Sequence, residues 1–319
     1  MTLRRRTILL GSLPMAPALA QPRFPNRPIR MIVPFAPGGD TDRQTRAICD
    51  AASRLLGVQV VVENRSGGSA ILGATALAND RAADGYLLGQ MPTNTFSLPL
   101  RQRVPPFNPL TDFTYIMQMV GYAYGLAVRA DAPFATLQEL VAFARANPGR
   151  ISYGTTSVGG QPHLVMERIA EQAGVELLHV PYRGSVESTA AVLGGSITAM
   201  SGSGWTEFHR QGTMRALAVW SAERNRFFPD VPTLRECGFD IVQTAPYGFA
   251  GPRGLAPEVV RTLHDAFRTA LQDPAHLAAV EAGAMQVEYL GPEDYAASVA
   301  RTLAENRALL GRLGLLGNG

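Results

Sequence analysis

The sequence contains no lysine, since all 29 of its basic residues are arginine. A Schiff-base or catalytic lysine is therefore excluded. Cysteine is also scarce, because Cys49 and Cys237 are the only two. An oxidising compartment would permit a disulfide between them, but their separation in sequence says nothing about their distance in the fold. The sequence leaves two alternatives for this pair, a disulfide bridge or two free buried thiols.

Motifs of well-known catalytic and nucleotide-binding sites are missing as well. The sequence has no G-x-S-x-G elbow, no P-loop, no G-x-G-x-x-G fingerprint and no H-E-x-x-H pair. Its five histidines, residues 163, 179, 209, 264 and 276, lack the spacing of metal ligands. We therefore predict neither a metal site nor a cofactor.

The N-terminal apolar run is too short to span a bilayer as an anchor. Residues 1–20 combine three arginines at positions 4–6, a short apolar stretch and an Ala-Leu-Ala site at 18–20, which is the pattern of a signal peptide. The Arg5-Arg6 pair fits twin-arginine export, with Sec export as the alternative. Without these three arginines, 26 basic residues balance 26 acidic ones. We therefore expect a soluble periplasmic protein. Its net charge is close to zero, so it has no excess positive charge to attract nucleic acid.

Strand-like and helix-like segments alternate along the 319 residues, a length that fits two α/β domains or one large domain. The first module has a strand over 29–33, a loop over 34–41 and a helix over 42–56. Later modules repeat this order and predict parallel sheets with helices on both faces. The C-terminal stretch is expected to be helical over 257–272, 275–283 and 292–313, with a short strand over 286–289.

The loops that follow the predicted strands are rich in Gly, Ser and Thr and poor in charge. A helix N-terminus presents unpaired backbone N–H groups and a partial positive charge, and glycine lets a ligand approach them closely. Several such helix ends around one cleft would hold a carboxylate without a lysine or an arginine. The alternative is that these residues serve turn geometry alone, but four or five such loops favour a binding site.

Some residues near these loops have alternative roles. His163 begins a helix after "GGQP", and we favour a hydrogen-bond partner that braces the loop over a catalytic group. Asp42 is either a general base or a partner of the helix N-terminus. Trp205 and Phe208 either close over a ligand or pack between domains.

Seven stretches of the chain together resemble one protein family. They are VPFAPGGDTD (33–42), VVVENRSGG (60–68), DFTYI (112–116), ARANPGRISYGTTSVGGQPHL (144–164), HVPYRGSVESTAAVLGGSI (179–197), RALAVWSAERNRFFPDVPTLRECGF (215–239) and YGFAGPRGLAPEVV (247–260). Their number and order resemble the substrate-binding proteins of tripartite tricarboxylate transporters, the Bug receptor family. The resemblance covers essentially the whole mature chain.

The resemblance implies a two-lobed α/β fold of the type II periplasmic binding class, a Venus flytrap in which each lobe is a sheet flanked by helices. Residues 21–121 and 232–319 would form lobe 1, and residues 122–231 lobe 2. The ligand would be a small organic carboxylate held between the lobes by backbone amides, hydroxyls and ordered waters. The implied partners are a large and a small integral membrane subunit of the transporter, and we expect the receptor to be a monomer.

The family's binding loops carry over onto two groups of residues. In the first lobe these are Phe35, Ala36, Pro37, Gly38, Gly39 and Asp42. In the second lobe they are Thr155, Thr156, Ser157, Gly159, His163, Tyr182, Arg183 and Gly184. Ser69, Thr93, Thr95 and Ser201, in further polar loops after strands, complete the expected ligand-binding set.

Three positions depart from the family pattern. The chain has Ser69-Ala70-Ile71 where further glycines are usual, and Thr198 where an aspartate is common. It has Pro246-Tyr247 where a larger aromatic residue tends to occur. These departures bear on the size and charge of the expected pocket.

The leading hypothesis is an exported receptor that binds an organic carboxylate by domain closure and catalyses no reaction. A second hypothesis is a periplasmic hydrolase that uses Ser157 or Ser201 with His163. A third is a sensor subunit that presents its liganded form to a membrane signalling protein.

Overall fold

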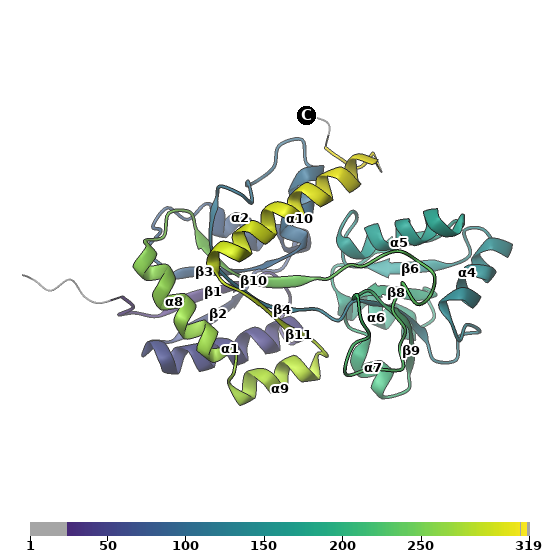
Figure 1. The fold of residues 1–319 in the computed structure, drawn as a ribbon, viewed down its shortest axis with the longest axis horizontal. Coiled ribbons are helices and arrows are strands. Elements are labelled where there is room, and N and C mark those ends of the chain that lie inside the picture. Colours follow the sequence, from purple (N-terminus) through teal and green to yellow (C-terminus); the bar gives the residue numbers. More distant parts are fainter. Residues whose placement is uncertain (1–23, 313, 318–319) are drawn as a thin grey trace, which may run out of the picture.

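A computed structural model describes residues 24–312 and 314–317 of the chain, but not the side chain of Ser69. The predicted signal peptide, residues 1–20, lies outside the described residues. Within them, the chain forms two lobes that lie side by side (Figure 1).

Each lobe is built on one mixed sheet, and the two sheets have six and five strands among the described residues. The first sheet contains β1 (Ile29–Val33), β2 (Val60–Asn64), β3 (Leu87–Pro92), β4 (Phe113–Gly121), β10 (Pro246–Pro252) and β11 (Gln286–Leu290). The second contains β5 (Gly125–Arg129), β6 (Ser152–Thr155), β7 (Leu178–Pro181), β8 (Ala199–Gly202) and β9 (Met214–Val219). The strand orders are β11-β4-β10-β3-β1-β2 and β7-β6-β8-β5-β9.

The prediction of parallel sheets is correct for only part of each sheet. Strands β1, β2 and β3 are parallel, as are β6, β7 and β8, but β10 pairs antiparallel with β3 and β4, and β5 with β8 and β9. The reason is the path of the chain. Strand β5 enters the second lobe from the first, and β10 enters the first lobe from the second. Each of these strands therefore runs away from the cleft, whereas β1, β3, β6 and β8 run toward it.

Helices cover both faces of each sheet (Figure 1). On the first sheet, α1 (Asp40–Leu56), α8 (Pro257–Ala270) and α9 (Pro274–Ala282) cover one face, and α2 (Ile71–Ala78), α3 (Asn94–Ser97) and α10 (Pro292–Arg312) the other. The second sheet carries α4 (Leu137–Ala146) and α5 (Gln161–Ala173) on one face and α6 (Ser185–Leu193) and α7 (Thr206–Arg210) on the other. Two short 3₁₀ turns, η1 (Gly68–Ala70) and η2 (Leu98–Arg101), follow β2 and α3.

Apolar side chains fill the space between each sheet and its helices. In the first lobe Ile48 and Phe267 lie under one face, and Leu77 and Tyr295 under the other. In the second lobe the apolar stripe of α4, which includes Leu140, packs with α5 residues against the sheet. Burial of these side chains is the main favourable contribution to the free energy of folding. It also fixes the positions of the helices whose N-termini face the other lobe.

The two crossings between the sheets lie at residues 122–124 and just before β10. The sequence placed the second boundary at residue 232, but Leu234, Phe239 and Ile241 pack into the core of the second lobe. We therefore place the return to the first lobe at residues 242–246.

Candidate ligand-binding site

Three helices begin at the edge of a sheet that faces the other lobe. Helices α1, α5 and α6 follow the carboxyl ends of β1, β6 and β7, and their N-cap residues are Gly39, Gly160 and Gly184. None of the three has a side-chain hydrogen bond at its N-cap. No side chain caps their first-turn amides, which with the positive dipole ends can meet an anion; Pro162, the second residue of α5, has no N–H and offers none. Helices α1 and α5 start at Asp40 and Gln161, two residues before their predicted starts, because glycine occupies the N-cap where a polar side chain is usual.

The loop over residues 34–39 is held in place by Asp42. Its Oδ2 accepts hydrogen bonds from the Gly38 amide at 2.9 Å and from Arg46 Nε at 3.0 Å, and its Oδ1 accepts from Asn64 Nδ2 at 2.8 Å. Asn64 also donates to the Phe35 carbonyl at 3.0 Å. Phe35 is half-buried, whereas Ala36, Pro37 and Gly38 are exposed.

The protonation of Asp42 follows from these contacts. Burial alone acts to raise the pKa of its carboxyl, but the hydrogen bonds from Arg46, Gly38 and Asn64 outweigh it and hold the pKa below its usual value. Asp42 is therefore an anion whose lone pairs are occupied by loop donors. It braces the loop and is not placed as a general base.

The second-lobe loop over residues 155–160 is braced from below by a stack of rings. The amide of Gly159 donates to His163 Nδ1 at 2.9 Å, and the rings of His163 and His179 stack with centroids 4.1 Å apart. His179 Nε2 lies 2.7 Å from Thr155 Oγ1, which in turn donates to the Ser157 carbonyl at 3.0 Å. These contacts fix the backbone that carries Thr156 and Gly159, where φ is +67° and glycine is needed.

His163 has the bracing role that the sequence favoured. Its Nδ1 accepts from a backbone amide, so the ring proton sits on Nε2, 3.5 Å from Glu167 Oε1. The pKa of Glu167 is lowered chiefly by its hydrogen bond with His163. Neither ring nitrogen is directed to a serine, and Ser201 Oγ donates instead to the Pro162 carbonyl at 2.9 Å. The described residues thus assemble no Ser–His pair of the kind that a hydrolase uses.

The remaining second-lobe candidates surround the start of α6. The Tyr182 amide donates to the Thr155 carbonyl at 2.8 Å, which joins the two second-lobe loops. The Arg183 amide donates to Glu187 Oε2 at 3.1 Å, and the Arg183 side chain is exposed. Gly184 has open space where a Cβ would lie.

The threonines expected after β3 lie at the start of α3. Thr95 Oγ1 donates to the Pro92 carbonyl at 2.6 Å, and Thr93 is buried at the N-cap of α3. Thr95 and Ser201 therefore secure the ends of strands and do not project a free hydroxyl. Ser69 lies in η1, and its side chain is outside the described residues.

Two tyrosines form the floor between the lobes. Tyr122 and Tyr124 belong to the first crossing and stack with ring centroids 5.7 Å apart. Tyr122 receives a hydrogen bond of 2.9 Å from Thr41, in the first turn of α1. The crossing is thus joined to the start of α1 through Thr41.

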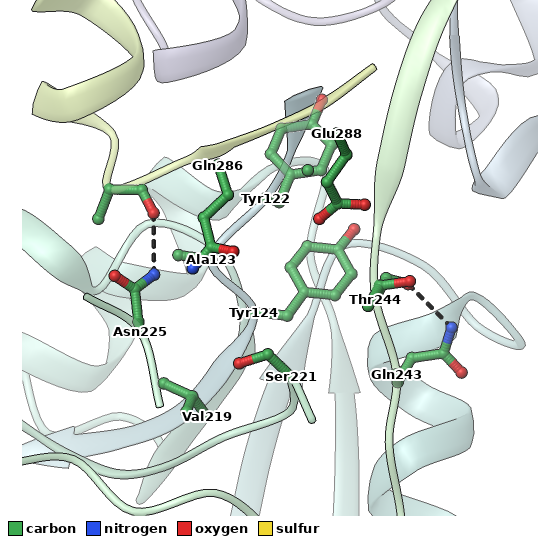
Figure 2. Close-up of a pocket in the computed structure, with 12 residues that line it drawn as sticks. Tyr122, Ala123, Tyr124, Val219, Ser221, Asn225, Gln243, Thr244, Gln286 and Glu288 are labelled. Atoms are coloured by element: carbon green, nitrogen blue, oxygen red, sulfur yellow. Dashed lines mark hydrogen bonds between the residues drawn. The ribbon is translucent and has the colours of Figure 1, made fainter. Parts of the chain in front are cut away.

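A small polar pocket lies beside this floor (Figure 2). Its volume of about 20 Å³ is room for roughly one water molecule. It is lined by both crossings and by β11, with Glu288 among its walls. Burial raises the pKa of the Glu288 carboxyl. An acidic wall and this volume do not suit an organic acid.

The lobes touch directly at the start of α5. Gln161 Nε2 donates to Asn306 Oδ1 of α10 at 2.6 Å, and Arg101 Nη1 donates to the Val158 carbonyl. At the far side, Arg210 donates to the last carbonyls of α9, at 2.9 Å to Ala282 and 3.1 Å to Glu281. Thr155, Ser157, Gly159 and Gly160 of this loop are buried, whereas Val158 is exposed.

Other residues singled out in the sequence have structural roles. Trp205 is fully buried and donates to the Ala123 carbonyl at 3.0 Å, so it packs against the crossing. Tyr247 is buried and donates to Gln44 Oε1 at 2.9 Å, which places it in the first core. Thr198 hydrogen bonds with Ser152 at the strand ends that lie away from the cleft, so its uncharged side chain does not alter the site.

The two cysteines are free and buried, Cys49 in the first core and Cys237 in the second. Across residues 24–312 and 314–317, no three His, Cys, Asp or Glu side chains gather as a metal site would require. In the same ranges no helix has the length and apolar character of a membrane span.

The model of one protein family, the tripartite tricarboxylate transporter family receptor, matches residues 44–315. This chain belongs to that family. The match spans both lobes and both crossings described above. Members of the family are periplasmic solute-binding receptors, and the two-lobed fold predicted from the sequence is confirmed.

Relatives of the receptor match over nearly its whole length. It is 39% identical over 311 residues to the UPF0065 protein in the gbd 5′ region of Cupriavidus necator, which covers 97% of this chain and 94% of that one. Among solved structures, the periplasmic binding protein BugD has a TM-score of 0.85 at 29% identity, covering 92% of this chain and 100% of its own. An R. palustris protein solved with adipate has a TM-score of 0.85 at 26% identity, with the same coverage.

Several residues around the cleft were not predicted from the sequence. Tyr122 and Tyr124 occur in the segment "GYAYG", whose aromatic residues between glycines mark the crossing. Asn64 is the last residue of β2. A polar residue at a strand end is a signal that its side chain could support a neighbouring loop, here the loop over residues 34–39. Asn94 and Arg101 lie after β3, where only Thr93 and Thr95 were predicted to bind the ligand.

Proposed function

We propose that this receptor is exported and captures a small organic carboxylate between its lobes for a tripartite tricarboxylate-type transporter. The observation that carries the proposal is the set of three glycine N-caps without side-chain partners at the ends of α1, α5 and α6. Their amides supply N–H donors for hydrogen bonds to a carboxylate. The R. palustris relative with adipate supports an acid as the ligand.

The bracing contacts explain how an uncharged loop binds an anion. Asp42, Asn64 and His163 hold the loop backbone by hydrogen bonds, so little loop entropy is lost on binding. The Asp42 carboxylate is turned into its own loop, where Arg46 partly neutralises it. A ligand carboxylate therefore meets amides and dipole ends and avoids direct repulsion.

Thermal denaturation of the chain from residue 21 onward tests the proposal. We expect one or more members of a panel of small mono-, di- and tricarboxylates to raise the melting temperature. A ligand present at 100 times its Kd stabilises the folded state by about 2.7 kcal/mol. The corresponding neutral amides serve as controls and should give no shift. Failure of every carboxylate at millimolar concentration would contradict the proposal.

Export and delivery require separate measurements in cells. A reporter fused to residues 1–20 should reach the periplasm, and a twin-lysine replacement of Arg5-Arg6 separates twin-arginine from Sec export. Deletion of the receptor should abolish uptake of the carboxylate found by denaturation. Retention of uptake together with loss of a carboxylate-induced transcriptional response would favour the sensor role instead.

A further inference from the structure

Polar side chains from both lobes gather around the two glycines that precede α5. A Cβ placed on Gly160 would lie 2.0 Å from Ser157 Oγ and 3.0 Å from Asn94 Oδ1. A Cβ placed on Gly159 would lie 2.6 Å from Arg101 Nε. Asn94 belongs to α3 and Arg101 to η2, so first-lobe groups reach the uncapped end of a second-lobe helix.

Atoms in this cluster lack hydrogen-bond partners although they are buried. They are Asn94 Oδ1, Arg101 Nε, Ser157 Oγ, Gln161 Oε1 and Asn306 Nδ2. Asn94 and Ser157 are each 5% exposed, Gln161 is 1% exposed and Asn306 is 4% exposed. More than about 90% of buried polar groups have a partner, and an unpaired one costs roughly 1–3 kcal/mol. Five at one contact between lobes indicate a group that the protein itself does not provide.

The charge of the cluster selects the kind of group. Arg101 is its only charged side chain, and it forms no ion pair with a carboxylate of the described residues. The N-terminus of α5, a helix of 13 residues, adds its positive dipole end. Arg101 Nε, Ser157 Oγ and Asn306 Nδ2 are donors, whereas Asn94 Oδ1 and Gln161 Oε1 accept and suit water molecules that accompany an anion.

We infer that the three unpaired donors, Arg101 Nε, Ser157 Oγ and Asn306 Nδ2, form a subsite for a second anionic group of the ligand. This inference rests on the proposed function, in which the ligand's first carboxylate binds at the glycine-started helix ends. The receptor then prefers dicarboxylates to monocarboxylates of equal length. Arg101 is a specificity-determining residue, and its hydrogen bond to the Val158 carbonyl holds the guanidinium against the loop.

Isothermal titration calorimetry with matched acid pairs tests the subsite. The pairs are succinate and butyrate, glutarate and pentanoate, and adipate and hexanoate, which differ within each pair by one carboxylate. In the wild-type receptor we expect the best dicarboxylate to bind at least about tenfold more tightly than its partner, about 1.4 kcal/mol. Arg101→Gln should abolish that ratio and leave the monocarboxylate affinity unchanged. Arg101→Lys should restore part of it, because it keeps the charge without the fork of donors.

Two matched variants separate the subsite from general effects. Arg103→Gln makes the same charge change at an exposed position two residues along, and Arg210→Gln removes the contact between lobes at α9. Both should keep the dicarboxylate preference, and the melting temperature confirms that each variant is folded.

The inference is overturned while the proposed function stands in two cases. One is equal binding of both members in every pair. The other is an Arg101→Gln variant that weakens both members alike, which would make Arg101 only a latch between the lobes. If no carboxylate of any class binds, the proposed function fails and the subsite fails with it.

Discussion

The helix starts on the two edges of the second sheet differ in how they are capped. Helix α4 begins at the edge away from the cleft, where Thr136 accepts from the Glu139 amide at 3.2 Å and Glu139 accepts from the Ala135 amide at 2.6 Å. Thr136 thus supplies the N-cap contact of a capping box, and Glu139 accepts from the preceding amide, that of Ala135, in place of the Thr136 amide. Helices α5 and α6 begin at the edge that faces the first lobe, and each has a glycine N-cap without a side-chain partner.

The same contrast occurs in the first lobe. Helix α9 is capped by Asp273, whose Oδ1 accepts from the Ala275 amide at 2.9 Å, whereas α1 begins at Gly39. Glycine in place of a good N-cap residue lowers the free energy of unfolding by a few tenths of a kcal/mol. In these two pairs the amides are left open at the edge that faces the other lobe and satisfied at the opposite edge, although α8, which begins after Ala256 at that opposite edge, also lacks a side-chain cap.

Removing the brace behind an open helix end should have the largest effect. Asp42→Ala leaves the donors of Gly38, Arg46 and Asn64 without their shared acceptor. We expect a loss of about 3 kcal/mol in the free energy of unfolding, the upper end of the range for unpaired buried groups. Urea denaturation measures the loss, and titration of the carboxylate ligand should show weaker binding.

A capped helix away from the cleft provides the matched control. Thr136→Ala should cost about 1 kcal/mol of stability and leave carboxylate affinity unchanged. An Asp42→Ala variant that binds the ligand as tightly as the wild type would show that the brace is irrelevant to the site.

Filling the space at one glycine N-cap should have the next largest effect. In Gly160→Ala the added methyl group meets Ser157 Oγ and Asn94 Oδ1, and such overpacking costs about 2 kcal/mol. The ligand should bind roughly 30-fold more weakly, as calorimetry would measure. Gly39→Ala is the control, because a Cβ there has nothing within 4 Å. Equal losses in the two variants would mean that the cap residue matters and the crowding does not.

Adding a cap at the cleft tests the comparison in the opposite direction. Gly184 has extended backbone, with φ −169° and ψ 168°, and open space for a side chain. Gly184→Asn should therefore gain a few tenths of a kcal/mol of stability. Its side-chain oxygen competes for the α6 amides, so we expect about threefold weaker carboxylate binding, or about 0.7 kcal/mol. A more stable variant with unchanged affinity would remove α6 from the site.

The sequence predicted much of this arrangement because its signals are local. Glycines after β-branched strands indicated the helix starts at the edge that faces the other lobe, and the Thr136-x-x-Glu139 spacing is the local signal of the α4 start at the opposite edge. The first-sheet strands next to the two crossings were missed, since β4 and β10 are buried on both faces and show no alternation. Contacts between distant segments, such as Asn94 with Gly160 or Gln161 with Asn306, depend on how the lobes meet. No local pattern encodes them.

The smallest expected effect concerns the rings that brace the α5 end. Burial and the neighbouring His163 lower the pKa of His179 to about 4, from 6.5 in the unfolded chain. Between these values the unfolded state binds more protons than the folded state, so the free energy of unfolding falls as the pH drops from 6.5 to 4. Urea denaturation across this range measures the slope.

His179→Gln should make that slope shallower without abolishing it. Burial also lowers the pKa of His276, which lies in the first lobe and titrates in the same direction in both proteins. The comparison of slopes is independent of any constant loss that the substitution itself causes. An unchanged slope would mean that His179 accepts its proton as readily in the folded protein as in the unfolded chain. A neutral ring stack would then not be what supports the open end of α5, and the Gly159–His163 hydrogen bond would have to hold the loop alone.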